Sequence, residues 1–219
     1  MTKTVLVIFV RNPAPGRVKT RLAQAIGDSK ACTLYQAMVS DTLKSAEETL
    51  FPVFLFHEGD HGEELPVEWS KASQRVVKQE GSDLGQRMTA AFELLFLEGF
   101  ERVVLIGSDI PGMDADLIKT AVKELAVNDV VIAPSSDGGY SLISIRKNGF
   151  RRELFQAIEW SSSQVLENTL KRCSQCGLTY RLLDSRLDID TIDDLRLYSL
   201  NRAEHAVHTN AWLDGNLKK

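Results

Sequence analysis

The stretch Arg102-Val103-Val104-Leu105-Ile106-Gly107-Ser108-Asp109-Ile110-Pro111 decides the fold class of this chain. Its run of branched apolar residues predicts a strand that is covered on both faces, as in a parallel sheet. Gly107 and Ser108 end the run, and Pro111 stops further pairing. Because ligands of open α/β sheets bind beyond the carboxyl ends of the strands, Asp109 is a candidate functional residue. The alternative is an aspartate that only caps a turn.

The remaining sequence alternates strand and helix patterns on either side of this stretch. Apolar runs predict strands at residues 4–10, 51–56, 75–79, 129–133, 140–145 and 178–183. Helical patterns begin at Arg17, extend from a cap at Asp28 to Thr49, and recur at 59–69, 83–98, 114–126, 153–158, 163–173 and 191–202. This alternation predicts one α/β domain, residues 1–203, with a mostly parallel sheet flanked by helices. Residues 204–219 are predicted to form a docked or loose C-terminal tail.

Composition excludes several classes of partner. The 219 residues are 43% hydrophobic and 26% charged, with a net charge of −4, which disfavours duplex nucleic acid. The apolar run from Val5 to Val10 is too short to cross a membrane, and no cleavage site follows it. The three cysteines do not form a disulfide framework. We therefore expect a cytoplasmic protein without a nucleic-acid or membrane partner, and a homodimer is left open.

Basic residues concentrate in the loop after the first strand and at the start of the next helix: Arg11, Arg17, Lys19 and Arg21. Gly16 lets the backbone approach a ligand. Cations at a helix start oppose the helix dipole, so a bound anion such as phosphate explains them. The alternative is a solvated basic patch. The loop lacks the glycines of the Walker A and dinucleotide motifs. Gly85 and Arg87, at a later helix start, are further candidates for nucleotide contact.

A second group of candidate metal ligands lies near the end of the chain. Asp188 and Asp190 lie on one side of an extended segment and, with Asp109, offer oxygen ligands that suit Mg²⁺ or Mn²⁺ rather than zinc. The alternative is capping, with Asp190 as N-cap and Asp193 and Asp194 in the first helical turn. We favour capping for Asp193 and Asp194 and metal binding for the other two.

Asp137, Gly138, Gly139 and Trp160 are candidates for an acceptor pocket, but purely structural roles explain them equally well. Asp137, Gly138 and Gly139 lie between two strands, where Asp-Gly is a strong hairpin signal. The paired glycines would also let a substrate approach backbone amides. Trp160 is either an aromatic wall of this pocket or a packed side chain.

The ordered set of these motifs resembles the GT-A-like transferase family known as domain of unknown function 2064, over about residues 4–200. The motifs that carry the resemblance are residues 11–22, Asp83-Leu84-Gly85-Gln86-Arg87-Met88, Gly107-Ser108-Asp109, Asp137-Gly138-Gly139-Tyr140 and Asp188-Ile189-Asp190-Thr191. The family lies in the nucleotide-diphospho-sugar transferase superfamily. More distantly, the chain is similar to the molybdenum-cofactor and 2-phospholactate guanylyltransferases.

The resemblance implies a single-domain Rossmann-like GT-A fold, with Lys19 and Arg21 on nucleotide phosphates and Asp109 on the metal. Asp188 or Asp190 would be the second metal ligand. Ile110 departs from the small polar residue expected after Asp109, and Ser162 stands where threonine is expected. Neither the base nor the acceptor can be assigned from these motifs.

Three functions fit these residues. Nucleotidyl transfer from an NTP to a small phosphorylated or hydroxyl acceptor needs positioning and charge stabilisation, with Lys19 and Asp109 as the catalytic pair. Glycosyl transfer from a nucleotide sugar often uses an Asp-x-Asp, whereas Asp109 is a single carboxylate here. A non-catalytic nucleotide-binding module would be expected to lack the metal carboxylates. The single aspartate and the strongly basic loop favour nucleotidyl transfer.

Overall fold

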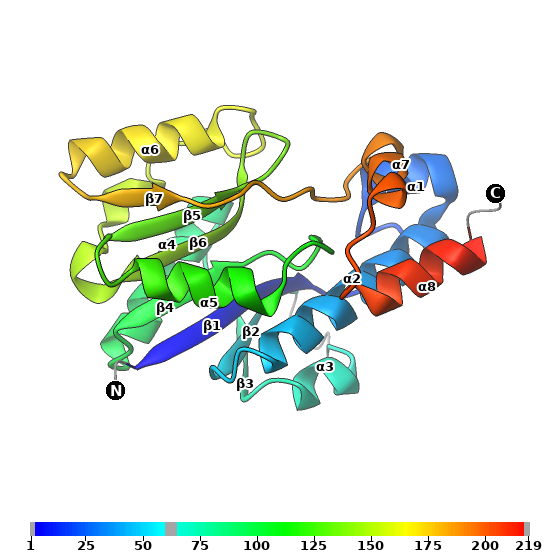
Figure 1. The fold of residues 1–219 in the computed structure, drawn as a ribbon, viewed down its shortest axis with the longest axis horizontal. Coiled ribbons are helices and arrows are strands. Elements are labelled where there is room, and N and C mark those ends of the chain that lie inside the picture. The colour runs from blue at the N-terminus through cyan, green and yellow to red at the C-terminus, as the bar shows by residue number, and fades with distance from the viewer. Residues whose placement is uncertain (1–2, 60–64, 217–219) are drawn as a thin grey trace.

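The computed structural model describes residues 3–59 and 65–216 as one seven-stranded sheet with helices on both faces (Figure 1). The strand order is β3-β2-β1-β4-β6-β5-β7. The strands are β1 (Thr4–Arg11), β2 (Val53–Glu58), β3 (Arg75–Lys78), β4 (Arg102–Ile106), β5 (Val130–Pro134), β6 (Tyr140–Arg146) and β7 (Tyr180–Leu182). β6 runs antiparallel to β4 and β5, and the other pairings are parallel. The predicted α/β fold and mostly parallel sheet are confirmed.

Alternating residues of β1 supply the cores on the two faces. Leu6, Ile8 and Val10 join one buried cluster, and Val5 and Val7 join the other. Side chains of successive strand residues point to opposite faces, so a continuous apolar run is what a doubly covered strand requires. β4 follows the same rule, which explains why its run has no polar alternation.

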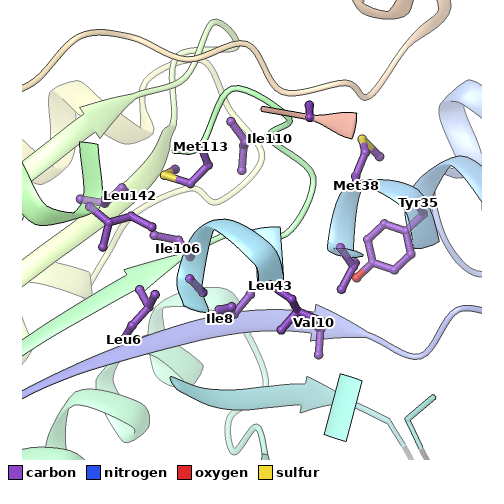
Figure 2. Close-up of a cluster of buried hydrophobic side chains, with 14 of the residues drawn as sticks. Leu6, Ile8, Val10, Tyr35, Met38, Leu43, Ile106, Ile110, Met113 and Leu142 are labelled. Atoms are coloured by element: carbon purple, nitrogen blue, oxygen red, sulfur yellow. The ribbon is translucent and has the colours of Figure 1, made fainter. Parts of the chain in front are cut away.

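The helices divide between these two cores. The first core is covered by α1 (Thr20–Ile26), α2 (Asp28–Glu47), α3 (Val67–Lys71), α5 (Ala115–Glu124), α7 (Ile192–Leu200) and α8 (Val207–Asn216). Figure 2 shows part of it, with Leu6, Ile8 and Ile106 of the sheet beside Met38 and Leu43 of α2. The second core is covered by α4 (Leu84–Leu97), α6 (Val165–Gln175) and the 3₁₀ turn Arg152–Phe155.

Several helix starts differ from the predicted ones. The first helix begins at Thr20, with Lys19 as its N-cap, rather than at Arg17. Gly27 is the N-cap of α2, and Asp28 is its first residue. Thr191 caps α7 through a reciprocal capping box with Asp194. Asp190 is therefore not the cap, because the threonine hydroxyl accepts the hydrogen bond that capping requires.

The segment predicted as a C-terminal tail contains α8, which packs against α2. Asp41 of α2 is buried and accepts hydrogen bonds from the backbone N–H groups of His208 and Thr209, both at 2.8 Å. Leu213 of α8 is fully buried in the first core. Within the described residues, no helix is long and apolar enough to cross a membrane.

Candidate functional site

The carboxyl ends of β1, β2 and β3 open onto a basic cleft of about 450 Å³. Four cationic side chains line it, together with Glu58: Arg11, Arg17, Lys78 and Arg87. The structure thus brings three of the predicted phosphate-binding residues together. Glu58 pairs with Arg11 Nε at 3.0 Å and with Arg87 at 2.7 Å. A carboxylate shared by two arginines holds the guanidinium groups at the cleft wall, where their planar forks suit phosphate oxygens.

Lys19, two residues after Arg17 in the chain, has an unusual environment. Its backbone is left-handed, with φ 49°, and its side chain is only 5% exposed. The ammonium donates a hydrogen bond to Asp109 Oδ2 at 2.7 Å. A buried lysine pairs its charge, and strained backbone concentrates at functional sites. These two features distinguish Lys19 from the solvated basic patch considered as the alternative.

Asp109 follows β4, the neighbour of β1 in the sheet, so the first loop and this aspartate share one edge. Burial acts to raise the pKa of Asp109, but the charge and hydrogen bond of Lys19, together with a backbone hydrogen bond, outweigh burial and hold the pKa below its ordinary value. Arg11 lowers it further. Asp109 is therefore ionised at neutral pH and available to a cation.

The late aspartates reach the same place from the segment between β7 and α7. Asp190 accepts a hydrogen bond from Arg21 at 2.7 Å and lies 3.7 Å from Lys19 Nζ. Asp188 accepts a hydrogen bond from the Ser136 hydroxyl at 3.2 Å. The pKa of Asp188 is raised, first by burial and then by the negative charges of Asp137 and Asp109. The charge of Asp190 is thus compensated by nearby cations, whereas Asp188 lies among other carboxylates.

The donor set fits a hard divalent cation rather than a soft one. Within residues 3–59 and 65–216, no three His, Cys, Asp or Glu side chains gather closely enough to enclose a metal ion. Mg²⁺ needs no such enclosure, because it is commonly held by one or two carboxylates together with waters and substrate phosphates. The carboxylates of Asp109 and Asp188 are of this type, and their mutual repulsion would be relieved by a cation.

The predicted acceptor residues come from two segments, the turn between β5 and β6 and the loop that follows the 3₁₀ turn Arg152–Phe155. Asp137, Gly138 and Gly139 turn between β5 and β6, as a hairpin requires. Gly138 has φ 90°, and a Cβ there would lie 2.2 Å from the backbone oxygen of Ser163. Asp137 accepts hydrogen bonds from Ser135 Oγ and Gly139 N. The positive φ and the approach to Ser163 explain Gly138, and the negative charge of Asp137 acts on Asp188.

Trp160 packs instead against Gly85 of α4. A Cβ at Gly85 would lie 2.7 Å from the indole ring, so this glycine serves close packing. Both residues line a second hollow of about 600 Å³ that shares Gly81 with the basic cleft. Arg87 therefore lines the basic cleft, whereas Gly85 lines this second hollow.

Three residues of the site are not indicated by the sequence patterns: Glu58, Lys78 and Tyr35. Glu58 was placed beyond a strand predicted to end at Phe56, whereas β2 continues two residues further and carries it to the site edge. Tyr35 lies among the buried residues of α2, where packing alone would explain it. Its hydroxyl in fact accepts a hydrogen bond from Arg11 N at 2.8 Å and lies 3.1 Å from Ser108 Oγ. The signal was available, because a buried tyrosine hydroxyl usually has a polar partner.

The fold and this site define a nucleotide-diphospho-sugar transferase architecture. The chain is 32% identical in sequence to a candidate nucleotide-diphospho-sugar transferase from Desulfovibrio desulfuricans. The crystal structure of that protein matches this one with a TM-score of 0.87 over 99% of both chains. A cytidylyltransferase from Leptospira borgpetersenii shares the fold at 15% identity, with a TM-score of 0.58 over 99% of this chain and 95% of that one.

The chain belongs to the family described as "Uncharacterized protein conserved in bacteria (DUF2064)", whose model matches residues 42–162. It is also 24% identical over 182 residues to a 2-phospho-L-lactate guanylyltransferase from Methanothermobacter thermautotrophicus. That match covers 81% of this chain and 76% of the relative. The resemblance predicted from the motifs is confirmed.

Proposed function

We propose that the protein transfers a nucleotidyl group from an NTP to a small phosphorylated or hydroxyl acceptor. The observation that carries this proposal is the ion pair between the buried Lys19 and the partly exposed Asp109, which follows β4 at the same edge of the sheet as the basic cleft. Cations that stabilise a polyphosphate and a carboxylate that can hold a divalent metal thereby lie side by side. The similarity to 2-phospho-L-lactate guanylyltransferases supports the same reaction class.

The basic side chains would bind the triphosphate. Arg11, Arg17 and Arg87 line the cleft and supply the charge that a polyphosphate needs. Lys19, next to them, would contact the α- or β-phosphate while its ammonium remains beside Asp109. Arg21 reaches the same region through Asp190. Gly16, with φ 77°, permits the turn of the loop that carries these residues.

Asp109 and Asp188 would hold Mg²⁺ or Mn²⁺. We favour Asp188 over Asp190 because Arg21 and Lys19 already compensate the charge of Asp190. A divalent cation would supply neutralisation of the phosphate oxygens around the reacting phosphorus. Asp190 would then orient Arg21 and Lys19 toward the nucleotide.

In the reaction, an acceptor oxygen forms a bond to the α-phosphorus and the bond between this phosphorus and the α–β bridging oxygen breaks. Pyrophosphate leaves, and the proton of a hydroxyl acceptor passes to solvent or to a nearby carboxylate. Lys19 and the cleft arginines stabilise the negative charge that grows on pyrophosphate. The acceptor would enter beside Asp188 and the Asp137–Gly139 turn, where Ser136 offers a hydroxyl. Trp160, which lines the second hollow, is not assigned to this acceptor site.

A thermal-shift panel tests this proposal against glycosyl transfer. We expect each accepted NTP with Mg²⁺ or Mn²⁺ to raise the Tm, since saturation at a hundred times Kd stabilises by about 2.7 kcal/mol. The matching nucleotide sugars should give smaller shifts, because they lack the γ-phosphate charge that the cleft accommodates. A larger shift from nucleotide sugars than from every NTP would instead establish a sugar donor.

A further inference from the structure

The hydroxyl of Tyr35 connects two segments that carry the site. Tyr35 belongs to α2 and is 4% exposed. Its hydroxyl accepts a hydrogen bond from the backbone N–H of Arg11, at the end of β1, at 2.8 Å. The same hydroxyl lies 3.1 Å from Oγ of Ser108, the residue that precedes Asp109. One buried oxygen therefore joins the start of the phosphate loop to the turn that presents the metal carboxylate.

This hydroxyl is well suited to a fixed geometry. Burial raises the pKa of Tyr35 to about 12, so the phenol remains neutral and keeps its proton throughout the physiological range. Its oxygen accepts from Arg11 N, and its O–H faces two acceptors, the Arg11 carbonyl at 3.5 Å and Ser108 Oγ at 3.1 Å, where Ser108 can also be the donor. Ser108 is itself only 4% exposed, so water does not readily replace either bond.

The ring of Tyr35 has a separate role in packing. It contacts Trp69 edge-on, with centroids 6.1 Å apart, and belongs to the core cluster on the α2 face (Figure 2). Phenylalanine would keep the ring in this core. Removing the hydroxyl alone therefore separates the link between the two loops from the packing of the helix.

We propose that Tyr35 is a positioning residue that fixes the phosphate loop relative to Asp109. This inference rests on the proposed nucleotidyl transfer. Loss of the Tyr35 hydroxyl leaves the loop cations and Asp109 in the protein. We therefore expect the affinity for the nucleotide in the ground state to change little. The transition state requires both at once, and small errors in their relative position are costly there.

The test compares Tyr35→Phe with wild type by NTP titration calorimetry, pyrophosphate release and urea unfolding. We expect kcat to fall about tenfold or more, since misplacement of reacting groups has effects of this size or larger. The Kd for NTP without metal should change less than threefold. Tyr198→Phe is the matched control, because it removes the hydroxyl of a buried tyrosine that contacts Asn210 of α8 rather than the site. Its kcat should equal that of wild type.

A double mutant gives the second readout. If the two hydroxyls act as one link, Tyr35→Phe combined with Ser108→Ala should lower kcat no further than Tyr35→Phe alone. An unchanged kcat for Tyr35→Phe, or additive losses in the double mutant, would overturn the positioning role. Absence of NTP-dependent turnover in wild type would instead refute the proposed function.

Discussion

Lys19 combines a rare backbone conformation, burial and an ion pair in one residue. A left-handed lysine costs on the order of 1–2 kcal/mol relative to the right-handed region. The surrounding structure keeps this strain because the conformation aims the ammonium at Asp109. The sequence indicated a phosphate-binding cation here, but neither the burial nor the strain was predictable. Both depend on contacts with residues 90 positions away.

Substitutions at Lys19 separate its charge from its backbone. Lys19→Ala should weaken NTP binding about tenfold or more in calorimetry, since it removes a charge-assisted contact worth roughly 1.5–3 kcal/mol. Lys19→Gly should weaken NTP binding as much as Lys19→Ala does. It should unfold at a higher urea concentration than Lys19→Ala, because glycine adopts φ 49° without strain. Lys30→Ala, an exposed cation of α2, should bind as wild type does. Unchanged affinity in Lys19→Ala would refute the phosphate-loop interpretation.

At the scale of elements, the strand ends determine which residues meet. The predicted strand at 51–56 ended before Glu58, so the carboxylate shared by Arg11 and Arg87 was missed. The late helix is predicted correctly, and its cap is Thr191 rather than Asp190, which the sequence offered only as the alternative to metal binding. The choice of Thr191 leaves Asp190 to pair with Arg21. Local propensity alone cannot decide between these residues, because the decision depends on a contact with α1.

Asp129 joins three strands at the far side of the sheet. It precedes β5 and accepts hydrogen bonds from Thr179 N and Oγ1, both at 2.8 Å, and from Arg146 of β6. Burial acts to raise the pKa of Asp129, but the Thr179 and Arg146 hydrogen bonds outweigh it and hold the pKa below its ordinary value. The ionised form is therefore the one that the folded state favours.

We expect Asp129→Ala to lower the free energy of unfolding by about 2–3 kcal/mol at pH 7, the cost of losing hydrogen bonds to a charged group. A carboxylate with a depressed folded pKa stabilises above its unfolded pKa of about 3.9, and this contribution is lost as pH falls through the folded pKa. The difference from wild type in urea unfolding should therefore shrink below about pH 4. Asp184→Ala, at an exposed position, serves as control. A difference that stays constant into acid would contradict this assignment.

Across the whole molecule, the sequence was sufficient for the architecture and for the edge that carries the site. Buried runs such as Val103–Ile106 and their alternation with helices predict a parallel sheet, and its strand ends placed Arg11 and Asp109 correctly. Two tertiary contacts were not predictable from the sequence. Trp160 packs on Gly85, and α8 docks on Asp41. Both are contacts between segments far apart in the chain, and no local pattern records them.

The central claim is that Asp109 supports transfer of a nucleotidyl group from an NTP. The most direct measurement is pyrophosphate release from each NTP with Mg²⁺ and a panel of small phosphorylated or hydroxylated acids, for wild type and Asp109→Asn. We predict release by wild type with at least one pair of substrates. We predict a rate for Asp109→Asn at least a hundredfold lower, about 2.7 kcal/mol of transition-state stabilisation, with the native fold retained by circular dichroism. Equal rates for the two proteins, or release of nucleoside diphosphate from nucleotide sugars without any pyrophosphate from NTPs, would contradict the account.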